Sequence, residues 1–359
     1  QNHLWWDFLA AQGKKHKVYY RTLLKLTCEK HYTLANLLIS FYKWYSKNVN
    51  KSVIKENITI DDIVFMAKKQ SEMEEGEFKL SVVVPNYNYE KFLYQRIYSI
   101  LYQKEKISEL IILDDCSKDN SRELIDEIVE KTKDYINIKK VYNETNSGTA
   151  FKQWEKGFKE ATGDYVWIAE ADDYCDNKFL KTVLKPIKND NDIVISYCDT
   201  AFIDKVGNVI LKSIKQEIDI MKTGHWDSDF VNEGSKEIND YSFLNCTIAN
   251  VSSVIFKNNN YSKYFKLAGK YRQCGDWLFY VKVMNDGKIS YVDKTFNYYR
   301  VHGSNVTSLT KKQKHFDEIK LVHNEIDKMY KFDKKQKSEI NKRYKFLRRV
   351  WSLDDGKDK

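Results

Sequence analysis

The sequence predicts an α/β fold in which helices flank a mostly parallel central sheet, with further helical segments at the N-terminal and C-terminal ends. Two observations lead to this class. Short apolar runs alternate with amphipathic stretches between residues 80 and 170, which is typical of parallel strands joined by helices. Two of these runs end in clusters of acidic residues, and ligands of such sheets bind at the carboxyl ends of strands. We therefore expect both clusters to face one crevice.

The first strand is expected within 80–88, where mostly apolar residues lead into Pro85. A second apolar run ends in Asp114 and Asp115, and a third begins at Tyr165. Apolar runs without alternation are typical of strands buried on both faces of a parallel sheet. The elements between them are expected to be helices at 89–103, 121–132 and 149–161 and a strand at 138–142.

The third run ends in Glu170, Asp172 and Asp173, three carboxylates within four positions. Carboxylates this close raise each other's pKa unless a cation lies among them. Mg²⁺ and Mn²⁺ take oxygen ligands and usually share them with substrate phosphates. The sequence thus indicates a site for one of these ions. The alternative is a polar turn in which Asp173 caps the next helix.

Two elements are expected further along the chain. The runs 197–204 and 209–211, separated by the pair Gly207 and Asn208, predict a β-hairpin. A strand is expected at 250–256.

Several motifs, in order along the chain, resemble those of family 2 glycosyltransferases of the GT-A fold, of the type that builds bacterial surface polysaccharides. These motifs are 80–88, 114–119, 146–148, 170–173, 275–277 and 299–307. The resemblance covers about residues 78–310. It implies a Rossmann-like GT-A domain with a nucleotide-binding half, 78–175, and an acceptor half, 176–310. Helical segments, 1–77 and 311–359, would lie on either side.

The resemblance implies roles for residues of the first half. Pro85, Tyr87 and Asn88 would lie under the nucleotide, and Glu90 would lie near its base. Asp115 would accept a hydrogen bond from the imide N–H of uracil or thymine. This agrees with its chemistry, because an ionised carboxylate only accepts hydrogen bonds. The alternative for Asp115 is a carboxylate that caps a turn.

The resemblance also assigns the acidic motif. Asp172 and Asp173 would correspond to the metal-binding acids, with Asp173 as the direct ligand of Mg²⁺ or Mn²⁺. Asp172 would also contact the nucleotide. Glu170 would lie behind them or contact a sugar hydroxyl. His302 would reach the metal or the diphosphate, although a lone histidine is more often a packing or surface residue. The ion would neutralise the diphosphate leaving group as it departs.

Asp276 is the candidate general base, which would take a proton from the acceptor hydroxyl as it attacks the anomeric carbon. A helix N-cap is the alternative, and one residue can serve both roles. Arg300 is a candidate to pair with phosphate, since a guanidinium matches two oxygens. Trp277 is a candidate to stack on or hydrogen-bond a sugar, with burial in the core as the alternative. Three further candidates for that sugar-binding role are Trp226, Tyr271 and Arg272.

Composition agrees with a cytoplasmic enzyme, and peripheral contact with the inner face of the plasma membrane is left open. Six cysteines without a close-spaced pair indicate neither a zinc site nor a disulfide framework. No apolar run reaches the ~18 residues of a membrane-spanning helix. No cleavable signal is visible. The chain begins at Gln1 and both ends look cut from something longer, so other domains are expected partners.

The net charge of +9 is unevenly distributed. Residues 311–350 form one long Lys-rich helical pattern with an apolar side, which could lie on an anionic membrane surface. We favour the alternative, a helix packed on the catalytic domain with a solvated Lys face. Nucleic acid is not an expected partner, because no recognised module accompanies the charge. The segment 1–77 is expected to be helical and accessory, and analogy cannot assign its role.

We therefore predict an inverting, metal-dependent glycosyltransferase. It would move a sugar from a UDP- or dTDP-sugar, with dTDP-rhamnose as one candidate, to a growing bacterial surface glycan of the O-antigen, capsule or S-layer type, lipid-linked at this stage. The alternative is a non-catalytic module that binds sugar nucleotides or glycans within a multidomain synthase. A nucleotidyltransferase would also use paired acids and Mg²⁺, but no Gly-rich signature with Lys or Arg lies near the first strand.

Overall fold

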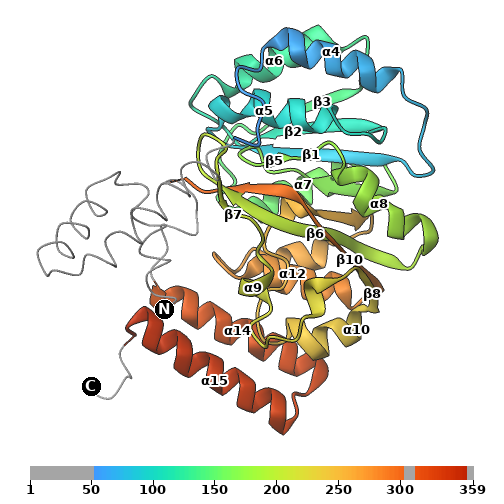
Figure 1. The fold of residues 1–359 in the computed structure, drawn as a ribbon. Coiled ribbons are helices and arrows are strands. Elements are labelled where there is room, and N and C mark those ends of the chain that lie inside the picture. Colours follow the sequence, from blue (N-terminus) through green and yellow to red (C-terminus); the bar gives the residue numbers. More distant parts are fainter. Residues whose placement is uncertain (1–51, 303–311, 354–359) are drawn as a thin grey trace, which may run out of the picture.

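A computed structural model describes residues 52–302 and 312–353. In this part of the chain one ten-stranded sheet forms the centre, and helices cover both of its faces (Figure 1). The strands are β1 Leu80–Asn86, β2 Glu109–Asp114, β3 Ile138–Tyr142, β4 Tyr165–Ile168, β5 Tyr174–Cys175, β6 Ile193–Ile203, β7 Val209–Leu211, β8 Phe230–Glu233, β9 Val254–Lys257 and β10 Lys288–Arg300. The α-helices are α4 Ile60–Ser71, α5 Glu90–Leu101, α6 Ser121–Thr132, α7 Ala150–Glu160, α8 Phe179–Asn189, α9 Lys215–Ile218, α10 Gly234–Glu237, α11 Ser262–Ala268, α12 Gly275–Met284, α14 Lys312–Tyr330 and α15 Lys334–Trp351.

The sheet is mixed. Its order is β3-β2-β1-β4-β9-β6-β10-β5, with β7 beside β6 and β8 beside β10. Strands β3, β2, β1 and β4 are parallel, so their carboxyl ends meet at one edge. Strand β9 runs antiparallel to both β4 and β6 and thereby joins the parallel half to the remaining strands. The expected α/β class, with parallel strands and flanking helices in the first half, is confirmed.

Side chains of β1 alternate between two cores. Val82 and Val84 pack with residues of α4, α5, α6 and α8, whereas Val83 packs with residues of α7, α11, α12 and α14. Burial on both faces is why this strand is apolar without alternation. Helix α7 comes unusually close to β1, since a Cβ added to Gly157 would lie 2.4 Å from the Val83 side chain.

Helix α4 belongs to the core of the nucleotide-binding half, although it precedes the first motif. Ile63 and Ala67 are buried in that core. The Gln70 side chain donates to the carbonyl of Gln103 (3.1 Å) and accepts from the backbone N–H of Ile107 (3.2 Å). The boundary predicted at residue 77 falls between α4 and β1 and stays a prediction. The rest of the predicted accessory segment, 1–51, lies outside the described residues.

The hairpin expected after residue 197 is present as β6 and β7. Its turn closes with a hydrogen bond from the Gly207 N–H to the Asp204 carbonyl (3.0 Å), and Gly207 has a φ of +91°. The strand expected at 250–256 begins only at Val254. Val251–Ser253 forms a short 3₁₀ turn instead, because the Asn250 side chain accepts from the Ser252 N–H (2.9 Å) and caps it. Two other short helical turns are His225–Asp227 and Ile238–Ser242.

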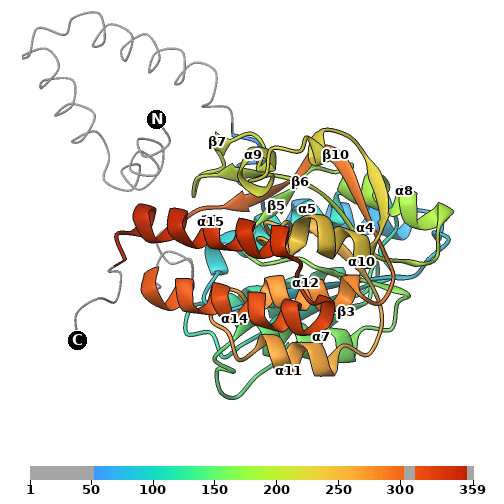
Figure 2. The ribbon, with the colours of Figure 1, turned by 90° about the horizontal axis from the view of Figure 1, so that it is seen from below.

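The C-terminal pattern, predicted as one long helix, is two helices that lie side by side (Figure 2). The break has a local cause. Lys331 adopts a φ of +54°, and Asp333 caps α15 through a reciprocal pair of hydrogen bonds with Gln336. The prediction of a single helix over 311–350 is therefore wrong at this point.

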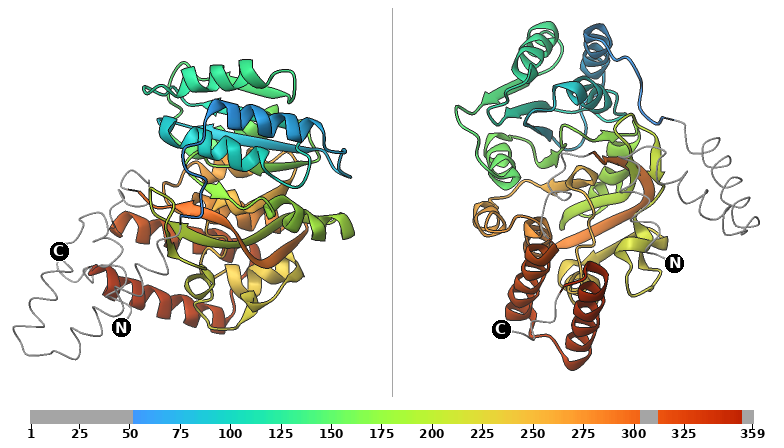
Figure 3. Two further views of the ribbon diagram at one scale, coloured as in Figure 1. Left: turned by 45° about the horizontal axis from the view of Figure 1, so that its top comes forward. Right: turned by 90° about the vertical axis from the view of Figure 1, so that its left-hand side faces the viewer.

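The apolar side of α14 faces the protein. Phe316, Val322 and Ile326 are buried in the core shared with α12, as the favoured alternative expected. Figure 3 shows α14 and α15, in red, at the opposite end of the molecule from α4 and α6. No helix of the described ranges is long and apolar enough to cross a membrane. Peripheral membrane contact stays a prediction.

Replacing Phe316 by Ala tests this packing. Phe316 is 1% exposed, and loss of a buried Phe side chain typically costs about 3–5 kcal/mol of unfolding free energy. Leu321→Ala, at a side chain of the same helix that is 52% exposed, should change stability by less than about 0.5 kcal/mol. Urea unfolding measures both variants. Equal effects at the two positions would contradict the orientation of α14.

Candidate active site

The loops that follow β1 and β2 are joined by hydrogen bonds. The Asn86 side chain donates to Asp114 (3.0 Å). Asn88, in the left-handed region with a φ of +58°, accepts from the Lys118 N–H (2.7 Å) and donates its own N–H to Ser117 (2.9 Å). The two carboxyl ends therefore form one polar rim, as expected from parallel strands.

The other expected nucleotide residues lie on this rim. Pro85 is buried beside Leu113 of β2, and Tyr87 is 43% exposed. Glu90 accepts from the Asn120 N–H (2.6 Å), which anchors it to the start of α6. Of Pro85, Tyr87 and Glu90, Tyr87 therefore offers an exposed aromatic ring to a ligand.

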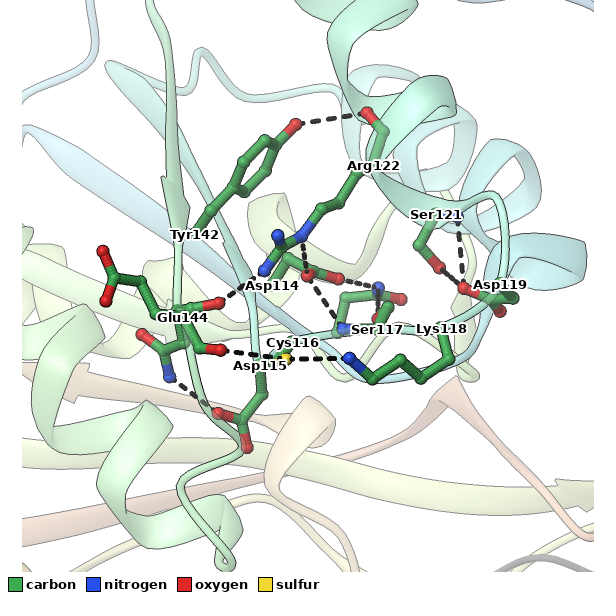
Figure 4. Close-up of polar contacts among 12 residues, drawn as sticks. Asp114, Asp115, Cys116, Ser117, Lys118, Asp119, Ser121, Arg122, Tyr142 and Glu144 are labelled. Atoms are coloured by element: carbon green, nitrogen blue, oxygen red, sulfur yellow. Dashed lines mark hydrogen bonds and ion pairs between the residues drawn. The ribbon is translucent and has the colours of Figure 1, made fainter.

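Asp114 and Asp115 point to different sides of the rim (Figure 4). Asp114 is fully buried and pairs with Arg122 (2.7 Å). Burial opposes its charge, but hydrogen bonds from Ser117 and Arg122 outweigh burial and lower the pKa of Asp114. Asp114 is therefore a structural carboxylate.

Asp115 accepts hydrogen bonds unequally on its two oxygens. Its Oδ1 accepts from the Asn143 side chain (2.6 Å), the Ser147 N–H (2.8 Å) and the Gln153 side chain (2.9 Å). Its Oδ2 accepts only from the Ser147 hydroxyl (2.8 Å) among the described residues. Each carboxylate oxygen has about two acceptor positions, so Oδ2 retains one for a ligand N–H.

The three acids of the motif do not converge on one point. In the described ranges, no group of three or more His, Cys, Asp or Glu side chains is arranged to hold an ion. Glu170 accepts from the indole N–H of Trp154 (2.7 Å), and burial, aided by the charge of Asp172, raises the pKa of Glu170 to about 8. One oxygen of Asp172 lies 2.8 Å from Nε2 of His302.

Asp173 is held by protein donors on both oxygens. Its Oδ1 accepts from the Arg300 backbone N–H (3.0 Å). Its Oδ2 accepts from the Asn250 side chain (3.0 Å) and the Ser252 hydroxyl (2.6 Å). Burial raises the pKa of Asp173. This arrangement joins the end of β4 to the 3₁₀ turn and to β10. As the direct metal ligand, Asp173 would have to exchange these partners.

The side chains at Asp172 are of types that can bind a hard divalent ion. Mg²⁺ is usually bound by one or two carboxylates plus substrate phosphates and water, rather than by a cage of protein ligands. Asp172 and His302 supply one carboxylate and one imidazole at the rim. The imidazole packs edge-on against Tyr89, with ring centroids 5.6 Å apart, and against Phe92 at the same distance. A bound Mg²⁺ or Mn²⁺ would supply positive charge next to a diphosphate.

Arg300 is bound by protein partners. Its side chain is fully buried and lies over the ring of Phe92 (4.6 Å). Its Nε donates to the carbonyl of Asp172 (2.6 Å), and its two terminal nitrogens donate to the Lys205 carbonyl and to Gln95 (both 3.0 Å). These hydrogen bonds join Arg300 to the backbone of the acidic motif, and the expected substrate contact of Arg300 stays a prediction.

Trp277 is likewise a core residue. It is 3% exposed, and its indole N–H donates to the carbonyl of Ser242 (2.8 Å), so no face of the ring remains for a sugar. Trp226 is buried in the same way and donates to Tyr197 (2.8 Å). Arg272 is exposed and remains a candidate for acceptor contact, as does the half-buried Tyr271.

Asp276 lies in the first turn of α12. Its Oδ1 accepts from the Trp277 N–H (2.8 Å). The N-cap of α12 is Cys274, so the alternative role of Asp276 as the N-cap is wrong. Burial raises the pKa of Asp276 to about 6, and the charge of Glu318 adds a smaller effect. A Cβ on the preceding residue, Gly275, would lie 2.4 Å from the Ala268 carbonyl oxygen. Only glycine permits this approach of α12 to α11.

The first turn of α7 connects the separate parts of the site. Gln153 donates to Asp115 and Trp154 donates to Glu170. The ring of Phe151 lies close to Gly275, since a Cβ added to Gly275 would be 2.6 Å from a ring carbon. Asp115, Glu170 and the residue before Asp276 therefore border the same part of α7. Sequence reasoning missed Gln153 and Trp154, because both look like ordinary residues of an amphipathic helix.

Comparisons with known proteins agree with this geometry. The sequence model described as Glycosyl transferase family 2 matches residues 81–238. An uncharacterized glycosyltransferase of Methanocaldococcus jannaschii is 31% identical over 239 residues, which cover 66% of this chain and 75% of that protein. The chain belongs to glycosyl transferase family 2.

Other relatives match over shorter stretches. An uncharacterized glycosyltransferase of Haemophilus influenzae is 35% identical over 143 residues, 40% of this chain and 55% of that protein. The poly(ribitol-phosphate) β-N-acetylglucosaminyltransferase TarS of Staphylococcus aureus is 36% identical over 105 residues, 29% of this chain and 18% of TarS. The chain thus spans about half the length of the first of these relatives and under a fifth of TarS.

Solved structures confirm the GT-A fold. The crystal structure of TarS residues 1–349 in complex with UDP-GlcNAc superimposes with a TM-score of 0.54 at 21% identity and covers 78% of this chain and 74% of that one. A mannosyltransferase of Pyrobaculum calidifontis in complex with GDP-Man and Mn²⁺ gives a TM-score of 0.51 at 14% identity, over 81% of this chain and 79% of that one.

Gly275→Ala tests how Asp276 is placed. The added Cβ would meet backbone and ring atoms, so we expect a loss of about 1–3 kcal/mol in unfolding free energy, together with reduced sugar transfer. Gly76→Ala is the matched control, because the nearest atom to its added Cβ is 3.5 Å away. Thermal unfolding and turnover measure both. A Gly275→Ala protein with unchanged stability would disprove the close approach.

Proposed function

We propose that this chain is an inverting, metal-dependent glycosyltransferase that uses a UDP- or dTDP-sugar. One observation carries the proposal. Asp115, Glu170 of the acidic motif and Gly275, which precedes Asp276, all contact the first turn of α7. A nucleotide base, a diphosphate and an acceptor hydroxyl can therefore bind in sequence along one edge of the sheet, as a sugar transfer requires.

The base preference rests on Asp115. Its Oδ2 has one acceptor position left, which suits the imide N–H of uracil or thymine. The exposed ring of Tyr87 provides a surface beside it, above the buried Pro85, with Asn88 and Glu90 holding the loop. The TarS structure with UDP-GlcNAc supports a uridine donor, whereas dTDP-rhamnose is a candidate from family resemblance alone.

The metal would bind at Asp172 and His302 in this proposal. Asp173 is the alternative ligand that the sequence favoured, but its oxygens already hold three donors. The ion, Mg²⁺ or Mn²⁺, would supply charge to the departing diphosphate. The neighbour that carries Mn²⁺ supports a divalent ion on this fold. Glu170, held by Trp154 between the metal side and Asp276, is proposed to contact a sugar hydroxyl.

Asp276 would accept the proton of the attacking hydroxyl. A pKa near 6 leaves it ionised at neutral pH while keeping it a better base than an ordinary aspartate. A single carboxylate base and direct displacement lead to inversion at the anomeric carbon. We propose a growing bacterial surface glycan, lipid-linked, as the acceptor. Relatives named for poly(ribitol-phosphate) and teichuronic acid chemistry support this class.

The experiment that tests the proposal is a donor panel. UDP-sugars, dTDP-rhamnose and GDP-mannose are compared for thermal stabilisation of the full chain with Mn²⁺ present. Donors that stabilise the protein are then tested for release of the nucleoside diphosphate. We expect stabilisation by a uridine or thymidine donor. Selective stabilisation by GDP-mannose would sink the base assignment.

Asp276→Asn tests catalysis. The variant should lose about 10²–10⁴-fold in kcat, because it removes the general base, while nucleotide affinity stays nearly unchanged. Proton NMR should show a product with the anomeric configuration opposite to that of the donor. Asp192→Asn, at a side chain that is 77% exposed, is the matched control.

Two results would contradict this role. Retained anomeric configuration would exclude the single displacement. Full kcat in Asp276→Asn would leave another carboxylate as the base, or favour the non-catalytic binding module.

Asp172→Asn tests the metal. Calorimetry of UDP binding, with and without Mn²⁺, should show that the ion strengthens binding to the wild type and not to Asp172→Asn, because the substitution removes a charged ligand. Asp173→Asn is measured in parallel. If Asp172→Asn keeps the Mn²⁺ effect and Asp173→Asn loses it, Asp173 is the ligand that the sequence predicted.

A further inference from the structure

A carboxylate from the C-terminal helices reaches the loop that carries the proposed base. One oxygen of Glu318, on α14, accepts from the backbone N–H of Arg272 (2.8 Å). Its other oxygen accepts from the N–H groups of Gln273 (2.7 Å) and Cys274 (3.0 Å). These three residues directly precede Gly275, the first residue of α12. Glu318 therefore binds the chain immediately before Asp276.

The arrangement is electrostatically favourable. Three consecutive N–H groups that point at one carboxylate form an anion-binding concavity, and hydrogen bonds to an ionised acceptor are about twice as strong as neutral ones. The positive end of the α12 dipole lies beside it. The side chain of Cys274, the N-cap residue of α12, makes no capping hydrogen bond, so a side chain from another helix supplies the anchor.

The same loop contacts the nucleotide-binding half. The Arg272 guanidinium donates to the carbonyl of Gly148 (3.3 Å). Gly148 follows Ser147, which donates twice to Asp115. Glu318 thus holds a loop that borders both the proposed base and the proposed nucleotide site.

We propose that Glu318 is a positioning residue for sugar transfer: it fixes the first turn of α12, and with it Asp276, relative to the donor site. This inference rests on the proposed function, since it takes Asp276 as the base. It also gives the C-terminal helices a role in the reaction, because they bring Glu318 to the loop. Both Asp276 and Glu318 lie outside the segment matched by the family model, 81–238.

Glu318 also acts on Asp276 through its charge. The titratable side chains that interact electrostatically with Asp276 include Cys246, Cys274, Tyr280 and Glu318. Burial raises the pKa values of both thiols and of the phenol, so these three groups contribute no charge at neutral pH. Removing the charge of Glu318 lowers the pKa of Asp276. The base would then stay ionised to lower pH, and the acid limb of the rate profile would move downward.

The test compares Glu318→Gln and Glu318→Ala with Glu325→Gln in the full chain. Glu325 lies on the same helix, pairs with Lys328 and is 26% exposed, so it serves as the control. Carbon NMR of protein labelled at aspartate carboxyls, with the Asp276 signal assigned by Asp276→Asn, gives the pKa of Asp276 without any substrate. Turnover with the donor selected by the panel gives kcat and KM.

We expect an Asp276 pKa of about 6 in the wild type and in Glu325→Gln, and a lower value in Glu318→Gln. Glu318→Ala should lose about 10- to 100-fold in kcat with KM for the donor unchanged, because a small displacement of the base costs rate and not donor affinity. If Glu318→Ala does not fold, Glu318→Gln, which preserves size, supplies both readings.

An Asp276 pKa and a kcat that are unchanged in Glu318→Gln would overturn the inference. Full activity of Asp276→Asn would overturn the proposed base instead. The two failures are distinguishable, because the NMR comparison reports the effect of Glu318 on Asp276 whether or not Asp276 is catalytic.

Discussion

A carboxylate removed from water must be given hydrogen-bond donors or a cation, and the site of this protein depends on that constraint. Asp114, Asp115 and Asp173 are all buried at the carboxyl edge of the sheet. Each is satisfied by donors from segments far apart in the chain, such as Arg300, whose backbone N–H lies 127 residues from Asp173. Meeting these demands ties the loops after β1, β2 and β4 to α7, to the 3₁₀ turn and to β10. The rim is rigid because its charges are satisfied there.

Helix α7 connects the residues of this rim with the start of α12. Gly157 lets the helix approach Val83 of β1 closely, so the position of its first turn is set by packing on the sheet. Gln153, Trp154 and Phe151 then contact Asp115, Glu170 and the position of Gly275. Functional groups carried on regular elements are held more precisely than groups on loops. One helix can thereby keep several reacting partners in register.

The C-terminal helices hold the start of α12 in a similar way, by packing and by hydrogen bonds to a carboxylate. The apolar face of α14 is covered by the domain, and its Glu318 provides the anchor for the start of α12. Packing thus determines where α14 lies, and Glu318 connects that position to the proposed base. The family model covers residues 81–238, and this part of the site lies outside that segment.

The sequence by itself determined the alternation of strands and helices, the clustering of Asp114 and Asp115 with the later acids at strand ends, and the family, because these follow from local patterns of apolar and polar residues. It also placed Asp276 at a helix start. Only the tertiary structure decided that Arg300 and Trp277 are buried and that Asp173 is held by three donors while Asp172 contacts His302. It also decided that Glu318 binds the loop before Asp276. The reason is physical. The hydrogen-bond partners of a carboxylate depend on how distant segments pack, and no local sequence pattern determines which oxygen can still bind a ligand.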